Sequence, residues 1–346
     1  MANSGRLRRS ALLAAGILLA AGILAAVLTD LFRKAPQKQS VVSFAMGSVL
    51  SVDLYGGADG TAEAVKNAVA ALDNSISRTI GNSYISRIGK NGKCTADGDF
   101  ADNMKALLAL CEATGGAFDV TIGALSDLWD VGGATPRIPT QDEIDAAMAL
   151  TDYRTVSLTG FQVSVPPGTL LDLGAAGKGM ACDAAKRILA ADGEVRGAVV
   201  ASGGSILCYG ENPGKKTWTV GVRDPDGGEN DLAGVIRCGE CFISTSGNYE
   251  KYFELDGVRY CHIISPFDGR PVNNGLKSVT VRADGGMKSD ALSTACFVLG
   301  EEKSLPILQA LNADAIFIYD DNTVFATAGI AGDFELTNDA YRMRGA

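Results

Sequence analysis

The stretch Leu171–Asp183 reads LDLGAAGKGMACD: a short apolar segment that ends in an acid, then three glycines with a lysine among them, then the start of a helical pattern. Glycines let backbone amides approach a ligand closely, a helix N-terminus favours negative charge, and lysine adds a mobile cation. This combination is suited to a phosphate or a pyrophosphate. It is not a Walker loop, because no Ser or Thr follows Lys178, and it does not match G-x-G-x-x-G. A tight strand-to-helix turn with a surface lysine is the alternative.

The composition indicates a globular chain with a substantial core. The 346 residues are 47% hydrophobic and 21% charged, which is enough for one large domain or two small ones. The net charge of −9 and the lack of a dense Lys/Arg stripe argue against a nucleic-acid partner. The 42 glycines exceed the average of roughly 7% and indicate many tight turns or close backbone approaches.

The N-terminal residues are predicted to lie outside the fold. Residues 1–10 are a basic flank, residues 11–29 are an apolar run near the lower length limit for crossing a bilayer, and residues 30–40 form a linker. The basic flank favours an N-terminus inside the cell, so residues 41–346 would form an extracytoplasmic domain. We expect an uncleaved membrane anchor. A cleaved signal peptide with secretion is the alternative.

Eight cysteines are scattered along this chain. An even number invites disulfides, but the chain is not a small, cysteine-dense scaffold. Most of the thiols are therefore expected to be free and buried among apolar side chains. The segment Cys238–Cys241 has C-x-x-C spacing, without the second pair that would complete a zinc site, and a redox-active pair is the alternative for it.

Hydrophobic periodicity predicts an α+β fold of one domain with mixed or antiparallel sheets and flanking helices. Helices and strands do not alternate strictly, which argues against a doubly wound sheet. Helices are expected over residues 62–76, 104–114, 140–150 and 179–191, and from a cap at Ser289 to Leu299. Strands are expected over residues 41–54 (interrupted at Met46-Gly47), 198–201, 218–222, 235–238, 242–245, 251–255, 258–263, 278–282, 315–319 and 324–327.

His262 is the only histidine of the chain, and it ends a predicted hairpin strand just before a turn. A single histidine excludes histidine-rich zinc sites. Imidazole is the side chain whose ordinary pKa suits general-base catalysis near neutral pH. His262 is therefore either a catalytic base or a partly buried ring with a structural hydrogen bond.

Asp290 and Thr294 lie four residues apart at the predicted start of a helix, so their oxygens face the same side of its first turn. Carboxylate, hydroxyl and backbone carbonyl oxygens are ligands for a hard cation such as Mg²⁺ rather than for Zn²⁺. The alternative is an acid that the helix dipole favours, beside an exposed threonine.

The segment Thr114–Trp129 is polar and rich in glycine for its apolar flanks. A predicted helix ends there, and the loop that follows presents an aromatic ring, a carboxylate and two hydroxyls. Such a loop is suited to receiving a heteroaromatic ring. A well-packed turn is the alternative.

These segments together resemble the ApbE family of FAD:protein FMN transferases. Two shorter segments, Met46–Ser48 and Ile76–Thr79, resemble the M-G-T and L-S-R-T motifs of that family, and the resemblance spans roughly residues 41–330. The five longer motifs occur here in the family's order, as Gly115–Trp129, Asp172–Asp183, Ser244–Tyr252, His262–Pro271 and Asp290–Thr294.

The resemblance implies an exported, Mg²⁺-dependent enzyme that splits the pyrophosphate of FAD and releases AMP. It would attach FMN through a phosphoester to a threonine or serine of a partner flavoprotein, either a membrane or an extracellular redox protein. His262 would be the base for the acceptor hydroxyl. The metal would be held by the backbone carbonyl of Ala175 and by Asp290, Ser293 and Thr294. The implied FAD site is lined by Met46, Thr79, Ala117, Phe118, Asp119, Asp172, Lys178 and Ile264.

The chain departs from the family pattern at several positions. Ser265 stands where the family usually has Asp, so a carboxylate that would orient His262 or hold a turn is missing. Gly177, Met180 and Tyr84 replace a common Ala, Tyr and Glu. Two alternatives to transfer are an FAD pyrophosphatase, which yields FMN and AMP, and a non-catalytic extracytoplasmic FAD-binding protein.

Overall fold

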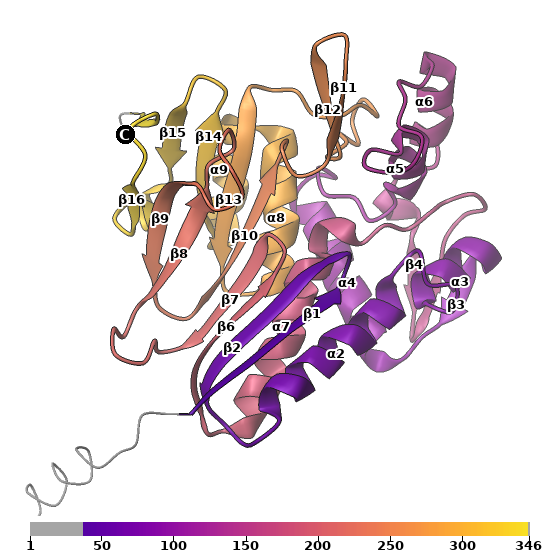
Figure 1. The fold of residues 1–346 in the computed structure, drawn as a ribbon. Coiled ribbons are helices and arrows are strands. Elements are labelled where there is room, and N and C mark those ends of the chain that lie inside the picture. The colour runs from indigo at the N-terminus through magenta and orange to yellow at the C-terminus, as the bar shows by residue number, and fades with distance from the viewer. Residues whose placement is uncertain (1–36, 345–346) are drawn as a thin grey trace, which may run out of the picture. The chain divides into compact units, whose positions relative to one another are not determined.

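A nine-stranded sheet lies at the centre of the computed structural model, which describes residues 37–344 (Figure 1). Its neighbouring strands run antiparallel, apart from the parallel pair at the C-terminal edge. In spatial order the strands are β1 (Lys38–Ala45), β2 (Ser48–Gly56), β6 (Val195–Ser202), β7 (Ser205–Gly210), β10 (Cys241–Gly247), β13 (Leu276–Ala283), β14 (Asp314–Tyr319), β15 (Thr323–Ala326) and β17 (Arg342–Met343).

Three small antiparallel sheets accompany the large one. The first is formed by β16 (Phe334–Leu336), β9 (Leu232–Cys238) and β8 (Trp218–Arg223), the second by β3 (Lys93–Thr95), β5 (Gln162–Ser164) and β4 (Ser157–Thr159), and the third by the hairpin of β11 (Tyr252–Leu255) and β12 (Val258–Cys261).

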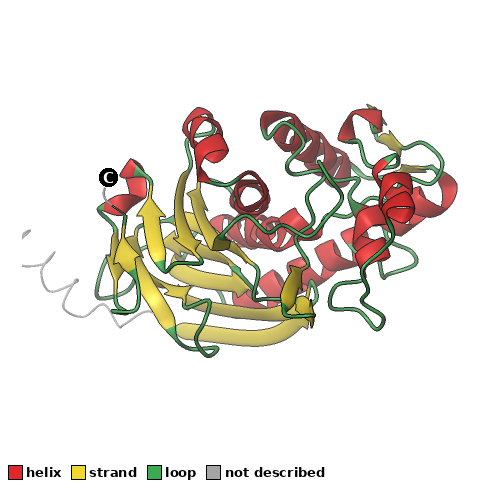
Figure 2. Cartoon of the chain, turned by 90° about the horizontal axis from the view of Figure 1, so that it is seen from above, coloured by secondary structure: helices red, strands yellow, loops and turns green. Residues whose placement is uncertain are grey.

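Two helices, α7 (Gly174–Asp192) and α8 (Gly286–Leu299), pack against each other and against the large sheet (Figure 2). The other helices are α2 (Thr61–Ile76), α3 (Tyr84–Asn91), α4 (Gly98–Ala113), α5 (Gly123–Trp129), α6 (Gln141–Met148), α9 (Glu301–Ala310) and α10 (Ala328–Ala331), with a 3₁₀ turn at Tyr153–Thr155.

Core layers lie on both faces of the large sheet, although Val42 and Phe44 of β1 and Val49 of β2 remain exposed. Successive residues of a strand point to opposite faces, so the neighbours Leu207 and Cys208 of β7 belong to different core layers. Leu207 and Val200 pack in the layer under α2 and α7. Cys208 packs with Trp218 and Ile236 in the layer under the small sheet of β8, β9 and β16. The sheet therefore has a helical face and a face covered by strands.

The helices α7 and α8 cross in backbone contact at a pair of glycines. A Cβ atom added to Gly179 would lie 2.0 Å from the carbonyl oxygen of Gly286, and one added to Gly286 would lie 2.1 Å from that of Gly179. No side chain other than hydrogen fits on either residue without moving a helix. This crossing fixes the position of α8 relative to the glycine-rich segment of α7.

The predicted α+β class is confirmed, and most predicted elements are present with shifted ends. The interruption at Met46-Gly47 is the turn of the β1–β2 hairpin. Thr140 caps α6 in a capping box with Glu143. The hairpin at Asp256-Gly257 joins β11 and β12. Local patterns of polar caps and turn residues therefore located these elements correctly.

Two predictions about helix ends were wrong. Residues 174–179 were expected to form a turn before the helix, but α7 already begins at Gly174, so the glycines serve close packing inside a helix. Ser289 was expected to cap α8, but that helix begins at Gly286. The carboxylate of Asp183 in α7 accepts the N–H groups of Gly286 and Met287, both at 2.7 Å, and satisfies the helix end in place of a local cap.

Further helices differ from the prediction. Helix α5 (Gly123–Trp129) occupies the second half of the segment Thr114–Trp129, which was expected to be a loop after a helix. α4 begins at Gly98, six residues before the expected start, because the side chain of Asp97 caps it by accepting the N–H of Phe100. α3 was not predicted. Its cap is Ser83, whose hydroxyl accepts the N–H of Ser86.

The predicted membrane anchor, residues 11–29, lies outside the described residues. Within residues 37–344, none of the helices has the length and apolar character needed to cross a bilayer.

Gly179→Ala is expected to destabilise the protein by about 2–3 kcal/mol, because the added methyl group meets backbone rather than a movable side chain. Unfolding in urea, followed by circular dichroism, measures the change.

Gly177→Ala is the matched control on the same helix. Its Cβ would meet the terminal methyl groups of Met46 at 3.1 Å and of Ile76 at 3.7 Å, which can shift. Alanine also has the higher helix propensity by roughly 0.8–1.0 kcal/mol. Stability should therefore stay level or rise. Equal losses in the two variants would mean that the backbone contact between α7 and α8 is not what limits substitution at Gly179.

Candidate active site

Asp290 in α8 lies in direct contact with the glycine- and lysine-containing turn of α7. Its Oδ2 accepts the backbone N–H of Gly179 at 2.9 Å, and the hydroxyl of Ser205 also hydrogen-bonds the carboxylate. A regular helix directs the N–H of Gly179 to the carbonyl oxygen of Ala175. The carboxylate and that carbonyl therefore approach the same N–H group.

Burial dominates the electrostatics of Asp290, which is only 3% exposed. Desolvation raises the pKa of this carboxyl, while the nearby Lys178 cation and the hydrogen bonds from Gly179 and Ser205 lower it in part. A buried carboxylate of this kind gains from an additional cation. The environment of Asp290 therefore fits a metal ligand.

Two hydroxyls on the next turn of α8 meet Ser246 of β10. The Oγ of Ser293 donates to the carbonyl of Asp290 at 2.8 Å and lies 2.8 Å from the Oγ of Ser246. The Oγ1 of Thr294 lies 3.1 Å from the same Ser246 oxygen. Ser293 is fully buried, whereas Thr294 is half-buried. Thr294 is therefore the more accessible of the two hydroxyls.

Lys178 supplies a positive charge beside Asp290. Among residues 37–344 it has no acidic side chain within ion-pair distance. Its Cδ lies beside Gly203 in the turn between β6 and β7, where an added Cβ would come within 3.1 Å. Because Gly203 has no side chain, the turn leaves room for the side chain of Lys178.

The backbone of the β11–β12 hairpin orients His262. Its Nδ1 lies 3.2 Å from the carbonyl oxygen of Lys251, and the backbone N–H of His262 donates to the same oxygen at 3.0 Å. A carbonyl oxygen only accepts, so Nδ1 carries the proton of the neutral ring. Nε2 then has its lone pair free. The single histidine is thus held in the tautomer that a general base requires.

The pKa of His262 is lowered to about 4. The ring has an exposed surface, yet protein atoms surround it and disfavour its charged form, and the cations of Lys178 and Lys251 add to that effect. The Lys251 carbonyl and the Asp172 carboxylate oppose it. His262 is therefore neutral at pH 7, and it lies close enough to Lys178 and Asp172 for their charges to act on it.

Ser265 performs one of the tasks expected of the missing family carboxylate. Its Oγ accepts the N–H of Phe267 at 3.3 Å, and its backbone is tied to Arg270 and Gly269. The turn after His262 is therefore held without an acid, and the ring is oriented by a backbone carbonyl instead.

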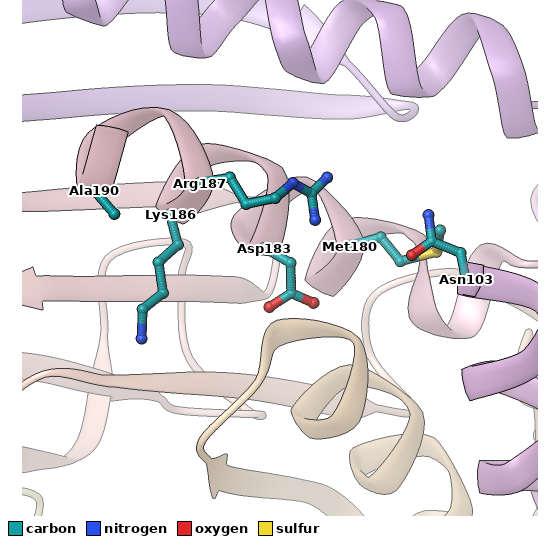
Figure 3. Close-up of a pocket in the computed structure, with 6 residues that line it drawn as sticks. All are labelled: Asn103, Met180, Asp183, Lys186, Arg187 and Ala190. Carbon is teal, nitrogen blue, oxygen red and sulfur yellow. The ribbon is translucent and has the colours of Figure 1, made fainter. Parts of the chain in front are cut away.

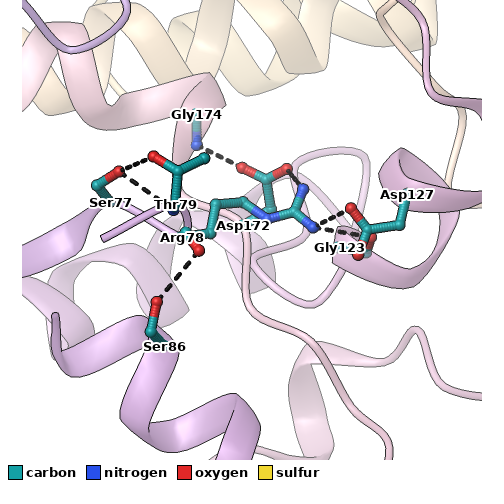
Figure 4. A network of polar contacts seen from close by, with 8 residues as sticks. All are labelled: Ser77, Arg78, Thr79, Ser86, Gly123, Asp127, Asp172 and Gly174. Carbon is teal, nitrogen blue, oxygen red and sulfur yellow. Dashed lines mark hydrogen bonds and ion pairs between the residues drawn. The ribbon is translucent and has the colours of Figure 1, made fainter. Parts of the chain in front are cut away.

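A network of charged groups holds Asp172 (Figure 4). One carboxylate oxygen accepts from Arg78 at 2.7 Å and the other from the N–H of Gly174 at 2.9 Å. Arg78 also donates to Asp127 at 2.5 Å and to the carbonyl of Gly123 at 3.4 Å. Both acids raise the pKa of Arg78 against the effect of burial. The guanidinium thus joins the end of α2, the start of α5 and the start of α7.

The loop of Ala117, Phe118 and Asp119 is packed into the protein. Ala117 and Phe118 are 2% exposed and belong to the core under α4. The carboxylate of Asp119 accepts from the N–H and the hydroxyl of Thr121 at 2.7 and 2.6 Å, and from the N–H of Tyr153 at 3.0 Å. Burial raises the pKa of Asp119 against these hydrogen bonds. In this structure Asp119 stabilises the conformation of the loop through buried hydrogen bonds.

Three remaining residues of the predicted FAD site have different surroundings. Met46 occupies a positive-φ position in the β1–β2 turn, and its N–H donates to Asp73 at 2.8 Å. Thr79 is exposed beside Ser77. Ile264 is buried and pairs with the strand segment at Pro271.

The cavity shown in Figure 3 contains none of the residues predicted for the site. It has a volume of about 400 Å³, runs along α7, and includes Asp183, Lys186 and Arg187. Asp183 is already bound to the N-terminus of α8, and Lys186 is paired with Glu240. Asp183 and Lys186 therefore already have partners, and we place the candidate site around Asp290, Lys178 and His262 instead.

Within residues 37–344, no three His, Cys, Asp or Glu side chains gather in a way that could hold a metal ion. The candidate donors around Asp290 are one carboxylate, a backbone carbonyl and hydroxyls. Such oxygen donors suit Mg²⁺, which needs few protein ligands because it keeps several waters and binds phosphate oxygens.

Sequence reasoning did not single out three residues that organise this site. Arg78 and Ser246 lie within motifs named above, but the sequence marks them only as polar residues and does not indicate their contacts. Ser205 reaches Asp290 only because β7 lies beside α8, which no local pattern indicates.

Two proteins with similar sequences carry the same name. The model of the ApbE family matches residues 46–317. A protein of Treponema pallidum called FAD:protein FMN transferase is 38% identical over 244 residues, which cover 66% of this chain and 67% of that protein. A Vibrio cholerae protein of the same name is 34% identical over 242 residues, which cover 67% of this chain and 72% of that protein.

Solved structures agree with the sequence matches. The ApbE protein of Thermotoga maritima superposes with a TM-score of 0.78 at 32% identity, over 85% of this chain and 98% of that one. The flavin transferase ApbE of Vibrio cholerae superposes with a TM-score of 0.76 at 27% identity, over 85% of this chain and 98% of that one. On the motifs, the fold and these matches together, the chain belongs to the ApbE family.

Proposed function

We propose that this chain is a Mg²⁺-dependent FAD:protein FMN transferase. It cleaves the pyrophosphate of FAD, joins the FMN phosphate to a threonine or serine of an acceptor flavoprotein, and releases AMP. The observation that carries the proposal is the contact of Asp290 with the N–H of Gly179 beside Lys178. The names of the relatives support the same activity.

The metal would be held by the carbonyl of Ala175, the carboxylate of Asp290 and the hydroxyl of Thr294. Ser293 was implied as a further ligand, but its hydroxyl is bound to Ser246 and to the carbonyl of Asp290. We assign it the task of holding this turn of α8. When bound, Mg²⁺ neutralises charge on the pyrophosphate oxygens.

Lys178 binds the oxygens of the same pyrophosphate. Its charge has no fixed acidic partner among residues 37–344, so a phosphate gains the full interaction instead of competing for it. The N-terminus of α7 adds the positive end of a helix dipole. Preorganised charge of this kind is the main requirement of phosphoryl transfer.

His262 acts as the base toward the acceptor hydroxyl. The proton moves from the hydroxyl to Nε2, the freed oxygen forms a bond to the FMN phosphorus, and the bond from that phosphorus to the bridging oxygen breaks. AMP leaves with the bridging oxygen. The carbonyl of Lys251 keeps Nδ1 protonated throughout and so keeps Nε2 directed to this task.

The flavin and the adenosine would be lined by Met46, Thr79, Asp172 and Ile264. The buried group of Ala117, Phe118 and Asp119 shapes the loop beside them. Arg78 keeps Asp172 in place from the opposite side.

The proposed location is the outer side of the cell membrane, with residues 11–29 as an anchor. The basic flank and the length of the apolar run support it. The acceptor is then a membrane or extracellular redox protein. Secretion after cleavage is the second choice.

Hydrolysis is a second candidate activity. The ring of His262 has an exposed surface, so water can reach the base when no acceptor is bound. Water in place of the acceptor hydroxyl would yield FMN and AMP.

The deciding experiment incubates the purified chain with FAD, Mg²⁺ and a peptide that carries an acceptor threonine. Transfer gives a flavin-labelled peptide and AMP, and hydrolysis gives FMN and AMP without a label. Unchanged FAD would indicate a binding protein and would refute both activities.

In the same assay, His262→Gln is expected to lower the rate of transfer by roughly 10²–10⁴-fold, because the amide cannot accept the proton. FAD binding, measured by quenching of flavin fluorescence, should stay close to wild type. A parallel loss of binding and transfer would assign His262 to the binding site instead of to catalysis.

The pKa of His262 can be measured directly, because the chain contains no other histidine. Proton NMR of the imidazole resonances in the untagged protein should give a value near 4. The base form is then present at all pH values above about 4 and is lost only as pH falls through that value. A midpoint near the ordinary value of about 6.5 would contradict the desolvated environment described above.

Asp290→Asn is expected to weaken Mg²⁺ activation by at least about 100-fold and to regain part of the rate at raised Mg²⁺. The exposed Asp284→Asn is the control, since Asp284 precedes α8 and, among the described residues, its carboxylate pairs only with Lys288 at 2.9 Å. Activity is measured as AMP release over a range of Mg²⁺ concentrations. An Asp290 variant with the same fractional loss at every concentration would remove this residue from the ligand set.

A further inference from the structure

Three cysteines that the flavin chemistry does not use meet at one place. Cys208 of β7 stands directly opposite Cys241 of β10 in the antiparallel register. Cys238 ends β9 and is separated from Cys241 by Gly239 and Glu240 alone. The three side chains pack in one core cluster, and all three thiols are free in this structure. We call Cys208, Cys238 and Cys241 the thiol cluster.

The thiol cluster lies at the seam between the large sheet and the small sheet of β8, β9 and β16. Cys208 is fully buried, Cys238 is 4% exposed and Cys241 is partly exposed. An oxidant therefore reaches the cluster through Cys241. The remaining five cysteines are buried in other core layers.

The turn between Cys238 and Cys241 is fixed from two sides. One carboxylate oxygen of Glu240 pairs with Lys186 of α7 at 2.7 Å, and the other accepts the N–H of Gly210 at 2.9 Å. The two thiols are thus presented by a held turn, which lowers the entropy lost when they are joined.

The surroundings favour a thiolate at Cys238. Hydrogen bonds from Cys208 and Cys241, with the Arg282 cation nearby, lower the pKa of Cys238 against the effects of burial and Asp333. Hydrogen bonding to Cys238 and burial raise the pKa of Cys208, which therefore stays a thiol and a donor. The thiolate is the nucleophile of thiol–disulfide exchange.

We propose that Cys238 and Cys241 are a reversible dithiol–disulfide site, in which Cys208 is the buried thiol that stabilises the reduced form. The oxidant is a low-molecular-weight disulfide such as that of glutathione. Cys241, the accessible thiol, first gives its proton to water, and its sulfur forms a mixed disulfide with one half of the external disulfide while the other half leaves as a thiolate and takes up a proton. Against the hydrogen bond to Cys208, the hydrogen bond to Cys238 and burial raise the pKa of Cys241, so deprotonation of Cys241 limits this first step. The thiolate of Cys238 then attacks the Cys241 sulfur, breaks the mixed disulfide and releases the second half as a thiolate.

The exchange balances in atoms and electrons. The two protein sulfurs lose two electrons in total and Cys241 loses its proton, and the external disulfide takes them up as one thiol and one thiolate. β10, which begins at Cys241, also carries Ser244 and Ser246, whose hydroxyls contact α8. The disulfide therefore fastens the start of a strand that supports the candidate active site. The proposal does not depend on flavin transfer.

The test equilibrates the purified full-length chain with reduced and oxidised glutathione at a series of ratios. The samples are then unfolded in denaturant that contains N-ethylmaleimide, so that every free thiol is blocked, and the protein is analysed by mass spectrometry. We expect two of the eight thiols to escape blocking at oxidising ratios and to return at reducing ones. The proteolytic peptide that contains Cys238 and Cys241 should lack two hydrogens.

Variants identify the pair. Cys238→Ser and Cys241→Ser should each abolish the protected pair, whereas Cys208→Ser and the distant control Cys94→Ser should retain it. Cys208→Ser should also move the pH at which Cys238 reacts with iodoacetamide up toward about 8.5, the ordinary thiol value. Eight reactive thiols at every ratio, or a protected pair that maps to Cys208 and Cys241, would overturn the proposal. Mapping of the wild-type protein decides even where a variant fails to fold.

Discussion

The crossing of α7 and α8 at Gly179 and Gly286 is the constraint on which the candidate site depends. Two helix backbones touch there without side chains between them. Because they touch, the N–H of Gly179 reaches the carboxylate of Asp290, and Asp183 reaches the N-terminus of α8. A wider crossing would leave a buried carboxylate without its donors, at a cost of several kcal/mol. The packing of the two helices and the placement of Asp290 therefore depend on the same backbone contact.

The charges around that contact are divided between two environments. Asp290 is buried, and desolvation raises the pKa of its carboxyl, so it favours a cation as neighbour. His262 has an exposed surface but is kept neutral by its surroundings and by Lys178. Lys178 therefore acts on both groups: it stabilises the negative charge of the acid and disfavours a positive charge on the base. Lys178 has no fixed acidic partner among the described residues. Its charge favours the ionised form of Asp290 and the neutral form of His262, which are the forms that phosphoryl transfer needs.

The sequence predicted what local patterns encode and missed what distant contacts decide. Thr140 with Glu143 identified the start of α6, and Asp256-Gly257 identified a hairpin, because the cap and the turn are made by neighbouring residues. The start of α8 could not be found in this way, since its cap, Asp183, lies about a hundred positions earlier in the chain. The glycines before Lys178 indicated a turn, because their low helix propensity favours one. Packing against α8 outweighed that preference.

Residues that organise the site differ from those able to act on a ligand, because the polar groups of the first kind already have hydrogen-bond partners. One carboxylate oxygen of Asp119 accepts from Thr121 in its own loop and the other from the N–H of Tyr153 in the 3₁₀ turn. Asp172 accepts from Arg78 and from a backbone N–H, and the hydroxyl of Ser293 contacts both Ser246 and the carbonyl of Asp290. Motif resemblance alone gives these residues the same rank as Lys178 and the Nε2 atom of His262. Polar groups that already have partners gain little from a substrate, because each new bond replaces an old one. The chemistry is therefore concentrated in the few groups that folding leaves available.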